Sequence, residues 1–384
     1  MKIKNGSGQQ VFMFVSRFGV LGLLMLSLFS FHAAAQTKYE IVPDEEKRKT
    51  VTNFNNKKTS VDIEHVISFS LTRNRNVNKN QPSLKNNTIS LSEGAFGIKL
   101  NSSVEEMMNV LGTPTSTLNL SENTALFSYG RNLWVVTVNG LVHQVSNENQ
   151  WVSSSLTNLI AFDDRFDNQW KIQDSVGYEL SKAAIDAMKL NGQYVGNNIY
   201  RFTGPNGEQL DALLTVRSIN GDRALVVTGF NYTLAQSNVK NMLSLAAVTE
   251  SKEVIEYIED RRAQGETIAL DELITFTPSF EAFSEDGAII QVYENNLVLQ
   301  FQYDELNKLS VYEGLFDFEE KNQKWQYAKH YSGQSGDEVM QMYGDEVMGL
   351  DNYWQVFLHD AKYDFYFDET ESGLALVEFE MEFF

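Results

Sequence analysis

The chain has 384 residues, no cysteine and 42% hydrophobic residues, and its 51 Asp and Glu against 31 Lys and Arg give a net charge of −20. Without cysteine, disulfides, thiolate catalysis, cysteine-ligated zinc and a lipidated N-terminal cysteine are all excluded. The negative charge repels phosphate backbones and anionic lipids, so we expect the body of the protein to bind neither nucleic acid nor a membrane surface. Solubility alone is the other interpretation of the charge.

The first 35 residues have the pattern of a secretory signal peptide. Lys2, Lys4 and Arg17 precede an apolar run over residues 18–31, and Ala33 to Ala35 follow it. This pattern predicts cleavage after Ala35 and a bacterial periplasmic or secreted protein, with no membrane insertion after cleavage. An uncleaved anchor is the alternative, but a membrane-spanning helix needs roughly 20 apolar residues.

Residues 36–88 read as a basic, polar arm or linker. Residues 36–90 contain 10 Lys and Arg against 6 Asp and Glu, and they show little apolar periodicity. One strand is predicted within Val61–Leu71. The arm either folds back on the acidic body or leads to an acidic partner, and the sequence leaves both interpretations open.

The first structured unit begins with a capped helix. Ser103 is placed to cap it and Glu106 completes a capping box, while Gly112 and Pro114 stop it. Three β-rich runs follow at residues 125–129, 133–138 and 141–145. The Asn-Gly pair at residues 139–140 predicts a tight hairpin turn between the last two runs.

This helix and meander, over residues 92–147, resemble the repeat unit of the BLIP-like and BamE-like periplasmic proteins. The resemblance implies a curved antiparallel sheet with helices on one face, a role in binding other proteins, and no catalytic residue in the motif. A weaker copy occupies residues 333–384. The two copies align at a constant offset of 232, through Ser103/Ser335, Glu105/Asp337, Glu106/Glu338, Met108/Met340 and Gly112/Gly344. A chance match of two capped helices is the alternative.

The segments between these copies show a similar rhythm. Helical patterns at residues 181–190 and 237–262 are each followed by β-rich runs, at residues 194–203, 209–218 and 223–232, and then at residues 274–276, 288–293, 297–303 and 308–318. We therefore predict an α+β fold of repeated helix-plus-antiparallel-meander units. The predicted domains are residues 89–235 and 236–384, with two units in each.

Motifs for nucleotide binding, nucleophilic catalysis and zinc binding are absent from the sequence. We therefore assign no catalytic, cofactor-binding or metal-binding residue and expect no cofactor. Asp368 to Gly373 is an alternative calcium loop, and a solvated acidic face is the favoured interpretation. A glycosidase-type carboxylate pair forms only in the folded chain, so the sequence does not locate one.

Aromatic residues make up 12% of the chain, and many lie in predicted strands. In residues 363–367 the alternation places Tyr363, Phe365 and Phe367 on one face and Asp364 and Tyr366 on the other. Trp134, Trp354 and Tyr366 are candidates for a partner-binding face, and core packing is the alternative for all three. The predicted function is a non-catalytic protein-binding, assembly or inhibitor-type module of the bacterial envelope. Its expected partner is an envelope protein with a basic surface. The alternative is a periplasmic hydrolase of glycan or peptide that uses a carboxylate pair.

Overall fold

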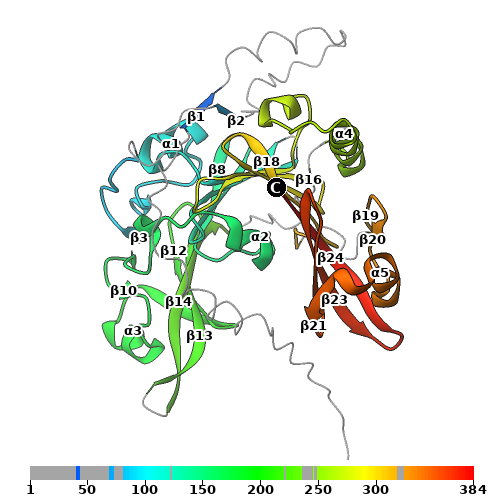
Figure 1. Cartoon of the computed structure of the whole chain (residues 1–384). Coiled ribbons are helices and arrows are strands. Elements are labelled where there is room, and N and C mark those ends of the chain that lie inside the picture. Colours follow the sequence, from blue (N-terminus) through cyan, green and yellow to red (C-terminus); the bar gives the residue numbers. More distant parts are fainter. Residues whose placement is uncertain are drawn as a thin grey trace, which may run out of the picture. The chain divides into compact units, whose positions relative to one another are not determined.

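The computed structural model describes residues 40–43, 69–72, 81–121, 123–219, 222–235, 245, 249–317 and 324–384 (Figure 1). The predicted signal peptide lies outside these residues. In the region of the predicted arm, strand β1 (Glu40–Pro43) pairs antiparallel with β2 (Phe69–Thr72). The predicted strand within Val61–Leu71 is therefore described only from Phe69 onward. The chain divides into two compact units, Met1–Gln36 and Thr37–Phe384, and everything below concerns the second.

The main feature of the second unit is one antiparallel sheet of sixteen strands in the order β11-β12-β13-β14-β8-β7-β6-β5-β15-β16-β17-β18-β24-β23-β22-β21. Its first half contains β5 (Ser116–Ser121), β6 (Thr124–Tyr129), β7 (Leu133–Val138), β8 (Leu141–Ser146), β11 (Gly192–Gly196), β12 (Ile199–Thr203), β13 (Glu208–Ile219) and β14 (Asp222–Leu234). Its second half contains β15 (Phe280–Phe283), β16 (Ile289–Tyr293), β17 (Leu297–Gln302), β18 (Glu305–Val311), β21 (Val347–Leu350), β22 (Tyr353–Phe357), β23 (Ala361–Thr370) and β24 (Gly373–Phe383).

Small strands and short helices complete the described part of the chain. The minor strands are β3 (Thr88–Ser90), β4 (Gly94–Ala95), β9 (Lys171–Ile172), β10 (Val176–Gly177), β19 (Gln326–Tyr327) and β20 (His330–Tyr331). The helices are α1 (Val104–Leu111), α2 (Ser154–Leu159), α3 (Lys182–Met188), α4 (Ser251–Ala263) and α5 (Gly336–Tyr343), with short 3-10 turns η4 (Asp164–Phe166), η6 (Leu270–Leu273) and η7 (Gly344–Glu346). None of these helices has the length and apolar character needed to cross a membrane.

The predicted helix caps are confirmed. Ser103 caps α1 and Ser335 caps α5, and in each case the glutamate three residues later, Glu106 or Glu338, closes a capping box. The Ser103 hydroxyl accepts from the Glu106 N–H at 3.1 Å, and the Ser335 hydroxyl accepts from the Glu338 N–H at 3.3 Å. Each cap satisfies backbone donors that the first turn of a helix leaves free.

The predicted fold class, α+β with repeated helix-plus-meander units, is wrong. Among the described residues, strands account for 46% and helices for 18%, and the strands form one large antiparallel sheet. The physical reason is edge pairing. A separate meander would leave unpaired backbone groups on its outer strands, and in this chain those strands pair with one another instead, β14 with β8, β5 with β15 and β18 with β24.

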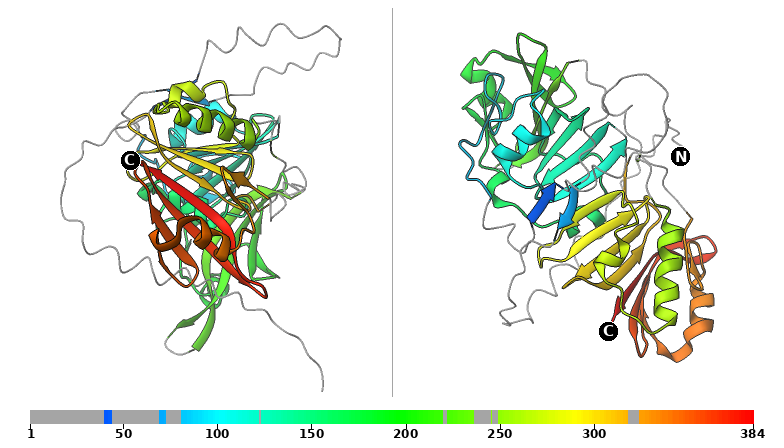
Figure 2. Two further views of the ribbon diagram at one scale, coloured as in Figure 1. Left: turned by 45° about the vertical axis from the view of Figure 1, so that its right-hand side comes forward. Right: turned by 90° about the horizontal axis from the view of Figure 1, so that it is seen from above.

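The sheet carries hydrophobic cores on both faces. One face holds two separate clusters, the first covered by α1 and α3 and the second by α4 and α5, which lie on the same side of the C-terminal strands (Figure 2). The opposite face holds a third cluster in the middle of the sheet, which includes Trp134, Leu118, Val298 and Leu156 of α2. This third cluster joins residues from both predicted domains. The boundary predicted near residue 236 falls outside the described residues and stays a prediction.

Candidate functional site

The strands β18, β24, β23, β22 and β21 present a polar face opposite the core that α4 and α5 cover. Backbone register aligns the side chains of this face in three rows across the strands. We call this surface the acid–tyrosine face. Its three rows are Lys308-Glu382-Lys362-Phe357, Ser310-Glu380-Asp364-Gln355-Met348 and Glu378-Tyr366-Tyr353-Leu350. Tyr312 lies beside Glu378 and Glu380 on the same face. Strand alternation produces the face, because residues two apart share one side of a strand.

Two lysines hold three of its carboxylates. The Lys308 ammonium lies 2.7 Å from Glu380 Oε2, and the Lys362 ammonium lies 3.0 Å from both Asp364 Oδ2 and Glu382 Oε2. The side chains of Asp364 and Glu380 are only 4% and 10% exposed. Burial removes water from the charged form of Lys362, but its two carboxylate partners outweigh this effect and raise its pKa. The ion pairs of Asp364 and Glu380 are therefore shielded from solvent, whereas the side chain of Glu382 is 43% exposed.

Tyrosine hydroxyls and an amide complete the hydrogen bonding of the two buried carboxylates. Glu380 accepts from the Ser310 hydroxyl at 3.1 Å and, more weakly, from Tyr312 and Tyr366 at 3.4 Å. Asp364 Oδ1 accepts from Tyr353 Oη at 2.8 Å and from Gln355 Nε2 at 2.7 Å. Each carboxylate thus has several donors, as a buried charge requires.

Glu378 differs from these carboxylates. It is half-buried, directly opposite Tyr366 in the β23–β24 ladder and two residues from Glu380 on the same face. Burial, followed by the charge of Glu380, raises the pKa of Glu378 to about 8, against the opposing effects of a hydrogen bond with Tyr312 and the charge of Lys308. Glu378 is therefore largely protonated at neutral pH, and a cation brought next to it would favour loss of that proton.

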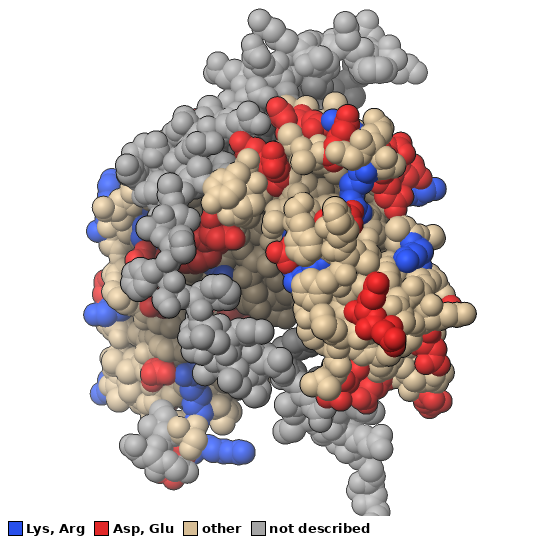
Figure 3. Space-filling view, in the orientation of Figure 1, with Lys and Arg blue, Asp and Glu red and all other residues tan. Residues whose placement is uncertain are grey.

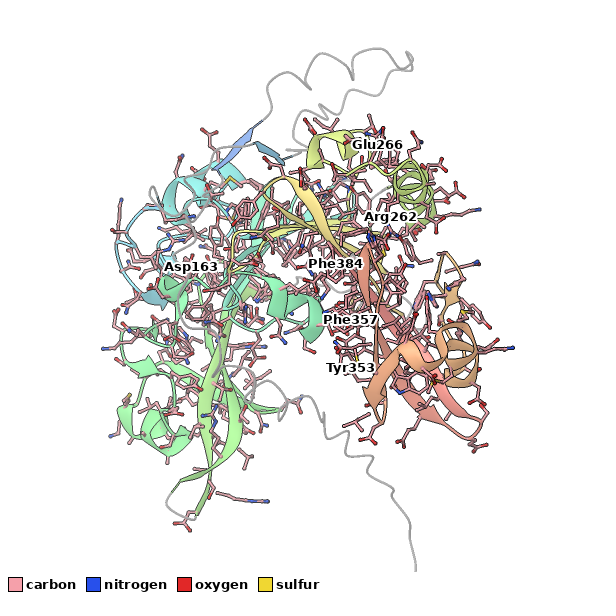
Figure 4. The ribbon with its side chains drawn as sticks, in the orientation of Figure 1. Asp163, Arg262, Glu266, Tyr353, Phe357 and Phe384 are labelled. Carbon is pink, nitrogen blue, oxygen red and sulfur yellow. The ribbon has the colours of Figure 1, made fainter. Side chains whose placement is uncertain are left out.

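Apolar side chains lie at the outer end of the face. Met348 is 52% exposed, Leu350 is 83% exposed and Phe357 is 49% exposed, and they stand on the edge strand and its neighbour. Tyr353 and Phe357 lie on the side of β22 that faces away from α5 (Figure 4). Accordingly, the acid–tyrosine face combines shielded charges at its centre with exposed apolar groups at its edge.

The structure does not bring Trp134, Trp354 and Tyr366 together on one face. Trp134 is fully buried in the third cluster and its indole N–H donates to the Arg131 carbonyl at 3.0 Å, so it does not lie on an exposed binding face. Trp354 is half-buried and packs on the α5 side of the sheet against Phe367, at 4.6 Å between ring centroids. Only Tyr366 lies on the acid–tyrosine face.

The sequence contained a signal for the residues that were missed. The alternation Glu378-Phe379-Glu380-Met381-Glu382 predicts three carboxylates on one face of a strand, and Asp364 had already been placed on the same face as Tyr366. The partners of these carboxylates come from β18 and β22. No local pattern connects those strands to β24 and β23 in advance of the fold.

The other polar candidates have structural roles. His330 is 1% exposed, its Nδ1 lies 3.0 Å from Gln334 Oε1 and its Nε2 lies 2.9 Å from Tyr343 Oη, and burial lowers its pKa to about 4. The alternative calcium loop at residues 368–373 is a β-hairpin in which β23 continues to Thr370 and β24 starts at Gly373. Among the described residues, no group of three or more His, Cys, Asp or Glu is arranged to hold a metal ion.

Charge is uneven over the surface of this region. Carboxylates outnumber lysines and arginines over α4, α5 and the last strands, on the right-hand side of Figure 3. The final 49 residues contain 13 Asp and Glu and one basic residue, Lys362, which is held by two carboxylates. A partner with a basic surface would therefore meet a complementary field.

No protein-family model, curated protein or solved structure matches the chain. The resemblance to the BLIP-like and BamE-like proteins thus stays a prediction, and function is argued below from the site alone.

Proposed function

We propose that this chain is an exported, non-catalytic protein-binding module of the bacterial envelope and that its acid–tyrosine face receives a basic surface of another envelope protein. The observation that supports the proposal best is the composition of that face. Shielded carboxylates and half-buried tyrosines stand next to the exposed Met348, Leu350 and Phe357. Aromatic and apolar groups would supply most of the affinity, and the carboxylates of the face would speed encounter with a basic partner.

Glu378 gives this proposal a pH signature. Its pKa of about 8 keeps it protonated in the free protein near neutral pH, and a lysine or arginine of the partner would favour its ionised form. Binding should then release a proton and become tighter as pH rises from 6 to about 8. Association should also slow as salt increases, since salt screens charges over about 10 Å at 0.1 M.

The experiment uses the mature chain as bait in an envelope extract, followed by binding kinetics of the purified partner. Tyr353→Ala and Tyr366→Ala should each raise the Kd about tenfold. Tyr303→Ala is the matched control, because Tyr303 is a 61% exposed tyrosine in the turn between β17 and β18. An association rate indifferent to salt, or equal losses from the Tyr353 and Tyr303 variants, would contradict the proposal. Export is tested separately, because a periplasmic protein that retains residues 1–35 by intact mass would exclude the predicted cleavage.

A hydrolase of glycan or peptide is the second candidate, and one observation favours it. Glu378, a carboxyl with a pKa of about 8, and Glu380, a carboxylate shielded from solvent, share one face of β24. Glycosidases use one carboxyl with a raised pKa as general acid and a second, ionised carboxylate. The test is release of reducing ends or free amines from envelope glycan and peptide. Turnover that Glu378→Gln abolishes, with the partner-binding Kd unchanged, would favour the hydrolase over the binding module.

A further inference from the structure

The sixteen-stranded sheet has two edges, and they differ in how they resist pairing with another chain. Strand edges expose unpaired backbone groups, which natural proteins protect with lysines and β-bulges. At β11 a bulge interrupts the pairing between Tyr194 and Gly196, and a lysine lies over the strand, since the Lys182 ammonium of α3 is 5.0 Å from the centre of the Tyr194 ring. The edge at β11 is thus protected.

The edge at β21 has neither device. Its four residues pair with β22 in continuous register, and within the described part of the chain no strand pairs with its other side. Leu350 and Tyr353 flank a two-residue turn, and such flanking residues form a hydrogen-bonded pair. The alternation of an antiparallel ladder then turns the N–H and C=O of Gly349 away from β22. Exposed backbone is therefore available on this edge.

The side chains of β21 also suit an added strand. Met348 and Leu350 are exposed on the acid–tyrosine face, where they extend its rows by one strand. On the other face, Trp354 covers Gly349, so closely that a Cβ on Gly349 would lie 2.7 Å from the indole Cδ1. Trp354 in turn fills the space beneath Gly336 at the start of α5. This packing fixes the edge strand against β22.

Charge selects the occupant. Asp345 and Glu346 precede β21 and Asp351 follows it, and all three are exposed. Two copies paired through β21 in antiparallel register would bring Asp345 and Glu346 of each copy next to Asp351 of the other, an arrangement of like charges only. An extended segment with lysine or arginine at its ends would instead find opposite charges at both ends of the edge.

We propose that β21 is a strand-addition site for an extended, basic segment of a partner protein, which would become the seventeenth strand of the sheet. This inference rests on the proposed function and specifies where and how the partner binds. Backbone hydrogen bonds to Gly349 would supply affinity that does not depend on the sequence of the segment. Alternate side chains of the segment would contact Met348 and Leu350, and its lysines or arginines would lie near Asp345, Glu346 and Asp351.

The test measures binding of the full mature chain to a labelled nine-residue peptide in which lysine alternates with valine and threonine. Leu350→Lys should weaken binding about tenfold, because it places a cation on the edge. Ile274→Lys is the matched control, since Ile274 is an exposed apolar residue outside the strands and the change in net charge is the same. Ile274→Lys should change the Kd less than twofold, because salt screens a charge that lies away from the edge. A peptide with N-methyl groups at alternate amides should bind poorly, as should one with glutamate in place of lysine.

Several results would overturn the inference. Equal effects of Leu350→Lys and Ile274→Lys, or equal binding of the N-methylated peptide, would mean that the peptide responds to general charge alone. A dimer by sedimentation that Leu350→Lys dissociates would assign the edge to a second copy. If the peptide fails while the partner from the extract still depends on Tyr353, strand addition at β21 is excluded and the proposed function stands. If the partner is also indifferent to Tyr353, both fail.

Discussion

Glu378 lies directly opposite Tyr366 in the β23–β24 ladder. The next aligned pair is Phe367 and Leu376, so Val377 has no partner on β23 and forms a bulge beside Glu378. On the Glu380 side of this irregularity the register is continuous, so strand alternation places Glu378 beside Glu380 and near Tyr312, where burial raises the pKa of Glu378 to about 8. A strand that carries acids at alternate positions is thereby kept from placing three full charges side by side.

Glu378 should make the protein less stable as pH rises. In the unfolded chain its pKa is about 4.5 and in the folded chain about 8, so between these values the folded state retains a proton that the unfolded state has lost. The free energy of unfolding attributable to Glu378 is therefore present below pH 4.5 and is lost as pH rises to 8. Glu378→Gln should stabilise the protein at pH 8, by about 2 kcal/mol after allowance for solvent screening, and should have little effect at pH 4.5.

Urea unfolding at pH 4.5 and pH 8 measures this difference. Glu382→Gln is the matched control, because Glu382 lies on the same face and is paired with Lys362. It should destabilise or leave stability unchanged at pH 8. Stabilisation by both substitutions would show that reduced net charge, and not the site of Glu378, is the cause.

His330 should have the opposite dependence. Its pKa falls from 6.5 in the unfolded chain to about 4 in the folded protein, because burial disfavours the charged ring. As pH falls from 6.5 to 4, His330 becomes protonated in the unfolded state but stays neutral in the folded state. The free energy of unfolding therefore decreases by up to about 3 kcal/mol. The variant His330→Phe should unfold with a weaker pH dependence in this window. His359→Gln, in the exposed turn between β22 and β23, is the control for loss of a histidine outside the core.

The two capping boxes allow a direct test of local stability. Ser103→Ala and Ser335→Ala should each cost about 1 kcal/mol, because each removes the acceptor for a first-turn N–H. Ser155→Ala, at an exposed position inside α2, should cost less than half of this. Thermal unfolding of the three variants is sufficient. A loss at Ser155 as large as at Ser103 would mean that serine removal, and not capping, is being measured.

Gly349 should not tolerate a side chain. A Cβ there would lie 2.3 Å from the Tyr353 carbonyl oxygen and 2.7 Å from Trp354 Cα, both backbone atoms that cannot move aside. Gly349→Ala should therefore release β21 from β22 and destabilise the protein by about 2 kcal/mol. Gly177→Ala is the control, since its Cβ would meet only the Trp170 carbonyl oxygen, at 3.9 Å. Hydrogen exchange of the β22 amides distinguishes loss of the edge from general unfolding.

Short-range features of this chain could be predicted from sequence, because their chemistry is local. The caps at Ser103 and Ser335 depend on residues three apart, and the alternation that buries Phe365 and Phe367 while placing Tyr366 with Asp364 depends on the strand period. Trp134 lies in the core, the alternative that the sequence left open, because β7 has a hydrophobic core on each face and either side of that strand is buried.

The fold class was missed for a reason that can be located. The two strands that join the halves of the sheet, β5 and β15, were not predicted, and residues 274–276, which were expected to be a strand, follow a 3-10 turn. Ser116, Leu118 and Leu120 alternate with half-buried residues, which is a strand signal, but β15 has four residues and few local cues. The strand β15 depends on pairing with β5, more than 150 positions earlier, and no local sequence pattern predicts a pairing over that distance.

The three joints of the sheet are short. The pairings β14–β8 and β5–β15 each span three residues per strand, and β18–β24 spans four. By contrast, β13–β14 and β23–β24 are paired along nearly their whole lengths. Under mechanical load the molecule should behave as a chain of stiff ribbons joined by weak links. Stretched by its ends, it should part at these joints first and lengthen in a few discrete steps, each the release of an intact ribbon. The β18–β24 joint crosses the acid–tyrosine face, so tension that parts it would separate Lys308 and Ser310 from Glu380 and take that face apart.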